Sequence, residues 1–131
     1  MLRSPLQSYK TISLETAPPG QLVLMLFDGA IKFLERAKLG FGIEDPVEMN
    51  ETVHNNITRA QDIINELNST LNMDQGGEIA VVLRDLYAYL DKRLFESNIR
   101  KELEGVQEVI DRLSTVQAGW SEMLELESAV A

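Results

Sequence analysis

The feature that most constrains the fold of this 131-residue chain is a spacing of apolar residues by three and four positions, repeated in four long stretches. Such a spacing places the apolar side chains on one face of an α-helix. The second stretch shows it most clearly, with Val53, Ile57, Ala60, Ile64, Leu67 and Leu71. No strand-like alternation of useful length accompanies it, so the pattern predicts an all-α protein.

Prolines and glycines mark the limits of the first helix. Pro18 is disfavoured in a helix by the proline that follows it, whereas Pro19 suits the first helical position. The apolar pattern continues to about Lys38, and Gly40 and Gly42 follow. We therefore expect the first helix to begin at the proline pair and to end before these glycines.

The second helix has a strong start signal. Asp45 can cap it, Pro46 suits its first position, and Glu48 completes a capping box. Its pattern ends near Asn72, where a turn over residues 74–77 follows. These signals predict a helix of more than six turns.

The third and fourth helices are expected on either side of a break near Asn98. The third starts near Glu78, and its predicted core face consists of Ile79, Leu83, Leu86, Leu90 and Leu94. The predicted core face of the fourth consists of Leu103, Val106, Ile110, Leu113, Trp120 and Leu124.

Four amphipathic helices joined by short loops favour an antiparallel up-down four-helix bundle, because short connections make sequential helices neighbours. We place this bundle at residues 18–127. Residues 1–17 lack a sustained helical period and are expected to form a mobile or docked N-terminal arm. Residues 128–131 are set apart as a C-terminal tail.

Charge and hydropathy exclude several classes of partner. The net charge of -9 opposes binding to nucleic acid or anionic lipid. The longest unbroken apolar run, at residues 22–27, is far shorter than the ~20 residues of a membrane span. The first residues also lack the apolar centre of a signal peptide. We therefore expect a cytoplasmic protein with no nucleic-acid partner and no membrane insertion.

The apolar residues of the first and third helices exceed what a bundle core needs. On the first helix they cover about 200° of the helical wheel, against ~100° or somewhat more for an ordinary core face. On the third, Val81, Ala88 and Phe95 recur every seven residues, nearly opposite the core face. Two interpretations stay open: the first helix is the most buried of the four and Phe95 an ordinary exposed aromatic, or these residues form a surface that receives another helix. An arm carrying Leu6 and Tyr9 could cover such a surface when no partner is bound.

No set of residues supports catalysis. Glu51 and His54 match the Glu-x-x-His pair of di-iron bundles, but the chain has one histidine and such a site needs two of these pairs. A phosphotransfer histidine is the other possibility weighed for His54, and the Lys and Gly that usually follow such a residue are missing. The chain has no cysteine, and the glycine pair at 76–77 fits a turn better than a phosphate loop. We expect no enzyme, no cofactor and no metal site.

Several short motifs occur together in this chain. They are Tyr9-Lys10, Thr16-Ala17-Pro18-Pro19, Leu24-Met25-Leu26-Phe27-Asp28-Gly29-Ala30, Gly76-Gly77-Glu78-Ile79-Ala80, Leu86-Tyr87, Arg93-Leu94, Asn98, Ala118 and Trp120. Their order and spacing, over residues 6 to 120, resemble the flagellar secretion chaperones of the FliS family. Four positions depart from the family pattern: Pro18, Val82, Ser97 and Gly119. None of them changes the apolar layout.

The resemblance implies a cytoplasmic chaperone for flagellar export. Such a protein binds the C-terminal segment of flagellin, which is disordered when free and forms helices on the chaperone. It prevents premature polymerisation and delivers flagellin to the type III export apparatus. The resemblance also implies that the arm, through positions matching Leu6 and Tyr9, contacts the export-gate protein once flagellin has displaced it.

The helical wheel and the resemblance together predict the flagellin-binding residues. They are Leu22, Met25, Leu26 and Phe33 of the first helix, and Val81, Tyr87, Ala88 and Phe95 of the third. The alternative function is a self-associating adaptor without flagellin cargo, whose apolar surface is an oligomer interface.

Overall fold

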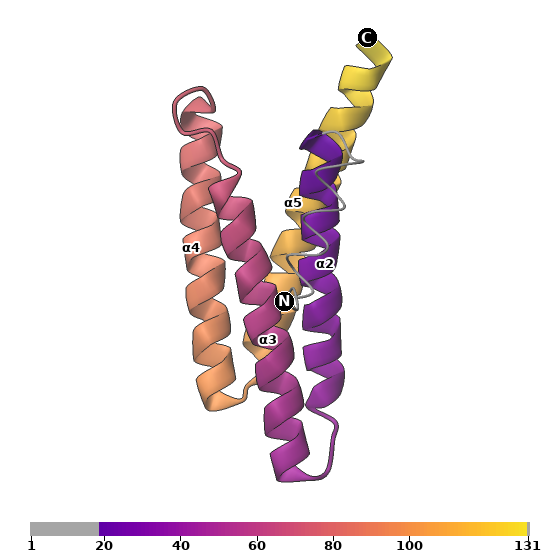
Figure 1. The fold of residues 1–131 in the computed structure, drawn as a ribbon, viewed down its shortest axis with the longest axis vertical. Helices are drawn as coiled ribbons and strands as arrows, with labels where there is room; N and C mark the ends of the chain where they lie inside the picture. The colour runs from indigo at the N-terminus through magenta and orange to yellow at the C-terminus, as the bar shows by residue number, and fades with distance from the viewer. Residues whose placement is uncertain (1–18, 131) are drawn as a thin grey trace, which may run out of the picture.

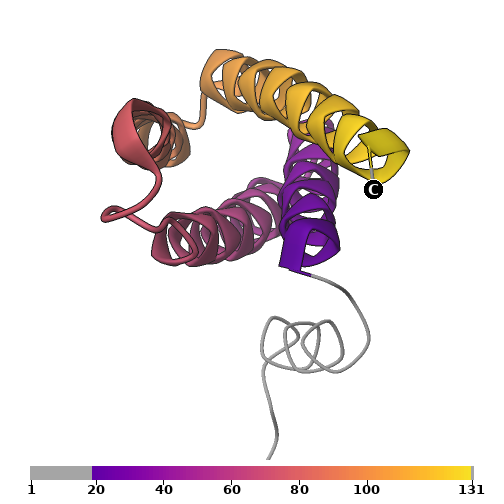
Figure 2. The ribbon, with the colours of Figure 1, turned by 90° about the horizontal axis from the view of Figure 1, so that it is seen from above.

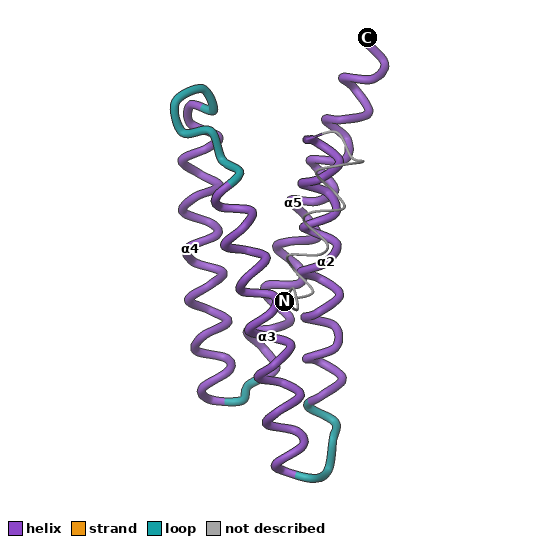
Figure 3. The backbone as a smooth tube through the Cα atoms, in the orientation of Figure 1, coloured by secondary structure: helices purple, strands orange, loops and turns teal. Residues whose placement is uncertain are grey.

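The computed structural model describes residues 19–130, and they form four α-helices joined by short connections (Figures 1 and 3). The helices are α2 (Pro19–Gly40), α3 (Pro46–Ser69), α4 (Gly77–Arg100) and α5 (Leu103–Val130). They pack against one another without a strand in this part of the chain. The prediction of an all-α four-helix bundle is confirmed.

Local sequence explains where α3 begins. Asp45 precedes the helix in an extended conformation, and its Oδ2 accepts a hydrogen bond from the backbone N–H of Glu48 at 3.4 Å. Pro46 occupies the start of the helix, where its missing N–H has no intrahelical partner to lose. The capping pattern seen in the sequence therefore sets this boundary.

The turn between α4 and α5 is the tightest in the described chain. Lys101 adopts a left-handed conformation with φ 52°, and the backbone N–H of Glu102 donates to the carbonyl of Ser97 at 3.0 Å. Such a left-handed residue ends a helix by supplying donors to its last free carbonyls. The chain consequently enters α5 at Leu103, directly beside the end of α4.

The helices are arranged in a ring, as the view from above shows (Figure 2). Each packs against the next in the chain, and α5 returns to pack against α2. Large side chains from all four helices fill the centre of the ring and are fully buried, among them Phe27, Leu34, Ile57, Ile64, Leu90, Leu94 and Leu113.

Two helices are longer than the sequence pattern suggested. The first continues to Gly40, two residues past Lys38. Helix α5 runs through Val130 and so includes residues 128–130, which we set apart as a tail. The predicted N-terminal arm lies outside the described residues.

None of the helices within residues 19–130 has both the length and the hydropathy of a membrane span.

Candidate partner-binding surface

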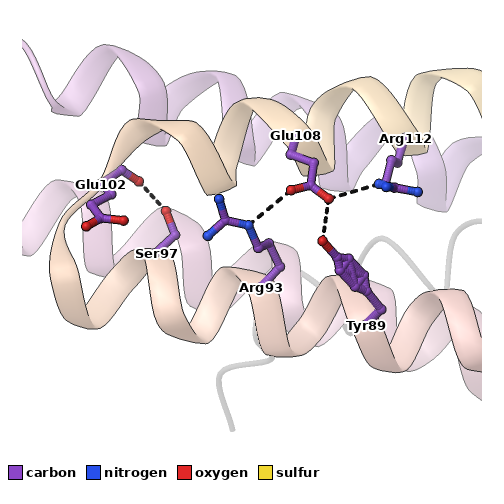
Figure 4. Close-up of polar contacts among 6 residues, drawn as sticks. All are labelled: Tyr89, Arg93, Ser97, Glu102, Glu108 and Arg112. Carbon is purple, nitrogen blue, oxygen red and sulfur yellow. Dashed lines mark hydrogen bonds and ion pairs between the residues drawn. The ribbon is translucent and has the colours of Figure 1, made fainter.

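Helices α4 and α5 meet at one end of the bundle and diverge toward the other (Figures 1 and 2). Where they meet, at the bottom of Figure 1, Gly105 approaches α4 so closely that a Cβ there would lie 2.7 Å from the Cβ of Ser97. The Ser97 hydroxyl donates to the carbonyl of Glu102 (Figure 4). The absence of a side chain at Gly105 thus lets the two backbones approach closely.

One turn further along α5, a single carboxylate joins the two helices (Figure 4). One oxygen of Glu108 accepts from Arg93 Nε at 3.1 Å. The other accepts from the Tyr89 hydroxyl at 2.6 Å and from Arg112 Nε at 3.0 Å. The Arg112 guanidinium also lies over the Tyr89 ring, 5.2 Å from its centre. We call the six residues of this closed half the lower seam: Tyr89, Arg93 and Ser97 of α4, and Gly105, Glu108 and Arg112 of α5.

These contacts perturb the ionisation of the groups that make them. The hydrogen bond from Tyr89, joined by those from Arg93 and Arg112, lowers the pKa of Glu108. The same bond raises the pKa of the Tyr89 phenol, and the bond to Glu108 raises the pKa of Arg93. Each shift favours the charge state in which the carboxylate accepts all three bonds. The ionisation states of Tyr89, Arg93 and Glu108 therefore suit the hydrogen bonds that they form in the lower seam.

Beyond Glu108 the facing sides of α4 and α5 become apolar. Continuing each helix by steps of three and four residues from the lower seam leads to Leu86, Val82 and Ile79 on α4, and to Val116, Met123 and Leu126 on α5. We call these six residues the upper seam. Ile79 is 72% exposed, Val82 64% and Leu126 63%.

Gly119, which lies on the same side of α5, faces open space. A Cβ added at Gly119 would meet no atom within 4 Å. Among the described residues, no hydrogen bond or ion pair joins α4 to α5 above Tyr89. Leu86 and Val116 pack against the core. The other four residues of the upper seam lie exposed on two helices that diverge.

Each of the two helices is also held on its other side. The Trp120 indole N–H donates to the carbonyl of Gly20 at 3.0 Å, and Leu124 packs against Gly20. These contacts keep the second half of α5 against α2. On α4, the carbonyl and carboxylate of Asp91 both accept from the Gln61 amide of α3, at 3.2 Å. Helix α5 thus follows α2, while α4 follows α3.

The residues predicted to bind flagellin occupy several parts of the molecule. Val81, Ala88 and Phe95 are exposed on α4, as the sequence predicted for them, and Phe95 is 59% exposed. Leu26 and Tyr87, in contrast, are core residues that are 2% and 3% exposed, and burial raises the pKa of Tyr87 to about 12. Either could contact a partner directly only if the bundle opened.

The three remaining predicted residues are partly buried on α2. Phe33 lies beneath two guanidinium groups, with Arg36 at 5.3 Å and Arg59 of α3 at 5.6 Å from its ring centre. Met25 lines a shallow groove between α2 and α5. Leu22 packs at the margin of the core. The structure therefore does not bring the predicted residues into one patch.

Phe95 belongs to an open groove between α4 and the beginning of α3. Its lining residues are Asn50, Glu51, His54, Asn55, Phe95, Asn98, Ile99 and Lys101. His54 Nδ1 and Asn98 Nδ2 lie 2.9 Å apart in a hydrogen bond. Within the described residues, no group of three His, Cys, Asp or Glu side chains could hold a metal ion.

The sequence pattern was wrong about Ile79 and missed much of the upper seam. Spacing placed Ile79 in the core, but it lies in the first turn of α4 and is 72% exposed. Val82 was noted only as a departure from the family pattern, and Met123 and Leu126 were not singled out. The available signal was the continuation of the apolar spacing on α5 past Trp120, to Met123 and Leu126.

Comparisons with known proteins agree along almost the whole chain. Residues 2–127 match the model of a family described as flagellar protein FliS. The flagellar secretion chaperone FliS of Salmonella typhimurium is 36% identical over 125 residues, which cover 92% of this chain and 90% of that protein. The flagellar secretion chaperone FliS of Bacillus subtilis is 32% identical over 126 residues, covering 96% and 90%. The similarity includes all four helices and both halves of the seam.

Proposed function

This chain belongs to the FliS family of flagellar secretion chaperones, and we propose that its cargo is the disordered C-terminal helical segment of flagellin. It is an export chaperone and not an enzyme. In our proposal it acts in the cytoplasm, keeps flagellin from polymerising prematurely and delivers it to the type III export apparatus.

The observation that carries this proposal is the upper seam. Two helix faces rich in large apolar side chains lie exposed and apart, where a monomeric protein ordinarily keeps such surface covered. A third amphipathic helix placed along them would bury Ile79, Val82 and Leu126 together, in the helix-in-groove mode of recognition. A flagellin segment that becomes helical on binding fits this surface.

The scattered positions of the other predicted residues favour a cargo that wraps around the bundle. Phe95 lies near α3, Met25 lies between α2 and α5, and Phe33 lies between α2 and α3. One rigid helix cannot reach all of these edges. A segment that is disordered before binding can cover several of them at once, and it loses conformational entropy in doing so.

Occupying the apolar face of flagellin also accounts for the block on polymerisation. The face that packs between filament subunits is unavailable while the chaperone covers it. In this proposal Leu6 and Tyr9 of the arm, outside the described residues, contact the export-gate protein after flagellin binds.

The proposal is tested by calorimetric titration of the protein with the C-terminal segment of flagellin from the same organism. We expect one-to-one binding with a negative heat-capacity change. Val82→Glu should weaken it at least about tenfold, because binding would bury an unpaired carboxylate. Phe95→Glu tests the groove on the other side of α4 in the same way.

Asn65→Glu provides a matched control, since it adds the same charge at an exposed position of α3. It should leave the affinity unchanged. Absence of binding at high micromolar concentration by a folded protein contradicts the proposal. A tight dimer in sedimentation that ignores flagellin would instead identify the apolar surface as an oligomer interface.

A further inference from the structure

Glu108 stands at the boundary between the covered and uncovered parts of α4. Leu90 and Leu94, on the core side of α4 at the level of the lower seam, are fully buried. On the same face beyond Tyr89, Leu86 and Leu83 are half-buried and Ile79 is 72% exposed. Tyr87 and Ala80, beside that face, remain buried. The change in burial therefore coincides with the last polar contact between α4 and α5.

The same carboxylate separates two positive charges. Arg93 of α4 and Arg112 of α5 both donate to Glu108, from opposite sides of the seam (Figure 4). The side chains of Arg93 and Glu108 are only 24% and 29% exposed, so solvent screens their pairing incompletely. Without the carboxylate the two guanidinium groups would repel, and the Tyr89 hydroxyl would lose its acceptor.

We propose that Glu108 is a positioning residue that determines where α4 separates from α5, and thereby how much of the apolar α4 face is presented to a bound helix. The part of this inference that concerns a bound helix rests on the proposed function, whereas the part that concerns the separation of the helices does not. Glu108 acts through Tyr89 and Arg93, and it makes no contact with cargo itself.

Hydrogen exchange of the whole protein without any partner tests whether Glu108 determines where α4 separates from α5. In Glu108→Ala, the amides of residues 82–93 should exchange roughly three to ten times faster than in the wild type, since a charged network of this kind has been removed. The amides of residues 57–67 in α3 should keep their protection. Glu104→Ala removes an exposed carboxylate from the same helix, four residues away, and should change neither segment.

A double-mutant cycle identifies the contact that protects residues 82–93 from exchange. Tyr89→Phe keeps the ring beneath Arg112 and removes only the hydroxyl. It should speed exchange of residues 82–93 in the wild-type background and have no further effect in Glu108→Ala, because the two side chains share one hydrogen bond. Equal acceleration in all four helices would show a general loss of stability and overturn the proposal, as would identical behaviour of Glu104→Ala and Glu108→Ala.

Binding of the flagellin segment tests whether Glu108 also controls how the α4 face is presented to a bound helix. Glu108→Ala should weaken binding several-fold, because the α4 face would no longer be held in place before the cargo arrives. Unchanged affinity alongside faster exchange would overturn the claim about cargo and leave the positioning of α4 intact. Failure of every variant and of the wild type to bind flagellin would refute the proposed function, while the exchange data would still decide the role of Glu108.

Discussion

The two halves of the α4–α5 seam join the same pair of helices in opposite ways. In the lower seam, Gly105 allows close approach, and Glu108 accepts two hydrogen bonds across the interface and a third from Arg112 of its own helix. In the upper seam, large apolar side chains lie exposed and Gly119 faces empty space. Polar residues thus close the interface where the helices touch, and apolar residues remain uncovered where they do not.

The difference shows that an apolar helix face indicates the core only where a neighbouring helix covers it. The second half of α5 is held to α2 through Trp120, on the side away from α4. The apolar surface of α4 is thus exposed where α5 lies against α2. Three predictions test this comparison, from the largest expected effect to the smallest.

Truncating one apolar residue in each part of α4 should have very different consequences. Leu94→Ala removes a fully buried side chain and should lower the free energy of unfolding by about 2–5 kcal/mol. Ile79→Ala, at the exposed end, should change it by less than ~0.5 kcal/mol. Urea unfolding followed by circular dichroism measures both.

The affinity for flagellin should depend more on Ile79 than on Leu94, the reverse of their order in the free energy of unfolding. The Ile79→Ala protein should remain folded and bind the flagellin segment more weakly than the wild type. A loss of several kcal/mol of stability in Ile79→Ala would show that the upper seam is covered in solution, contrary to the structure.

Adding a methyl group at each of two glycines of α5 should move stability in opposite directions. Gly105→Ala places a Cβ 2.7 Å from that of Ser97, and the resulting strain should cost about 1–3 kcal/mol. Gly119→Ala meets no atom and should stabilise the helix by up to ~1 kcal/mol, because alanine has the higher helix propensity. Thermal and urea unfolding of the two variants, measured in parallel, makes the comparison. Equal destabilisation by both substitutions would mean that α4 and α5 are in contact along their whole length.

The pH dependence of stability should separate the core from the lower seam. Burial raises the pKa of Tyr87 from 10.0 to about 12. The contribution of Tyr87 to the free energy of unfolding is therefore complete below pH 10 and is lost as the pH rises through about 12. The pKa of Glu108 is lowered, so its contribution is present above the pKa of the unfolded carboxyl and is lost as the pH falls through the folded value. Urea unfolding at a series of pH values measures both limbs.

Single substitutions assign each limb to its residue. Tyr87→Phe should reduce the alkaline limb and leave the acid limb unchanged. Glu108→Gln should reduce the acid limb, together with the part of the alkaline limb that comes from Tyr89, because the bond to Glu108 raises the pKa of that phenol. If Glu108→Gln left the acid limb unchanged, other carboxylates would account for it.

Much of the fold was predictable from the sequence. The four helices, the Asp45 cap and the antiparallel order all followed from apolar spacing and from proline and glycine positions. The exposure of Phe95 followed from its place opposite the core face of its helix. These features depend on residues close together in the chain, so local patterns contain the information.

The burial of Tyr87 and the exposure of Ile79 could not be predicted in this way. The helical wheel places Ile79 within the predicted core face of α4 and Tyr87 beside that face, yet Ile79 is exposed and Tyr87 is buried. A helical wheel gives the direction in which a side chain points and not what lies in that direction.

The sequence by itself thus determined four amphipathic helices, the start of α3 at the Asp45 cap and the FliS family. Only the tertiary structure showed which apolar face remains uncovered, because exposure depends on contacts between helices. Trp120 binds Gly20, 100 residues away in the chain, and Glu108 joins α5 to α4. The periodicity of a single helix contains no information about such contacts.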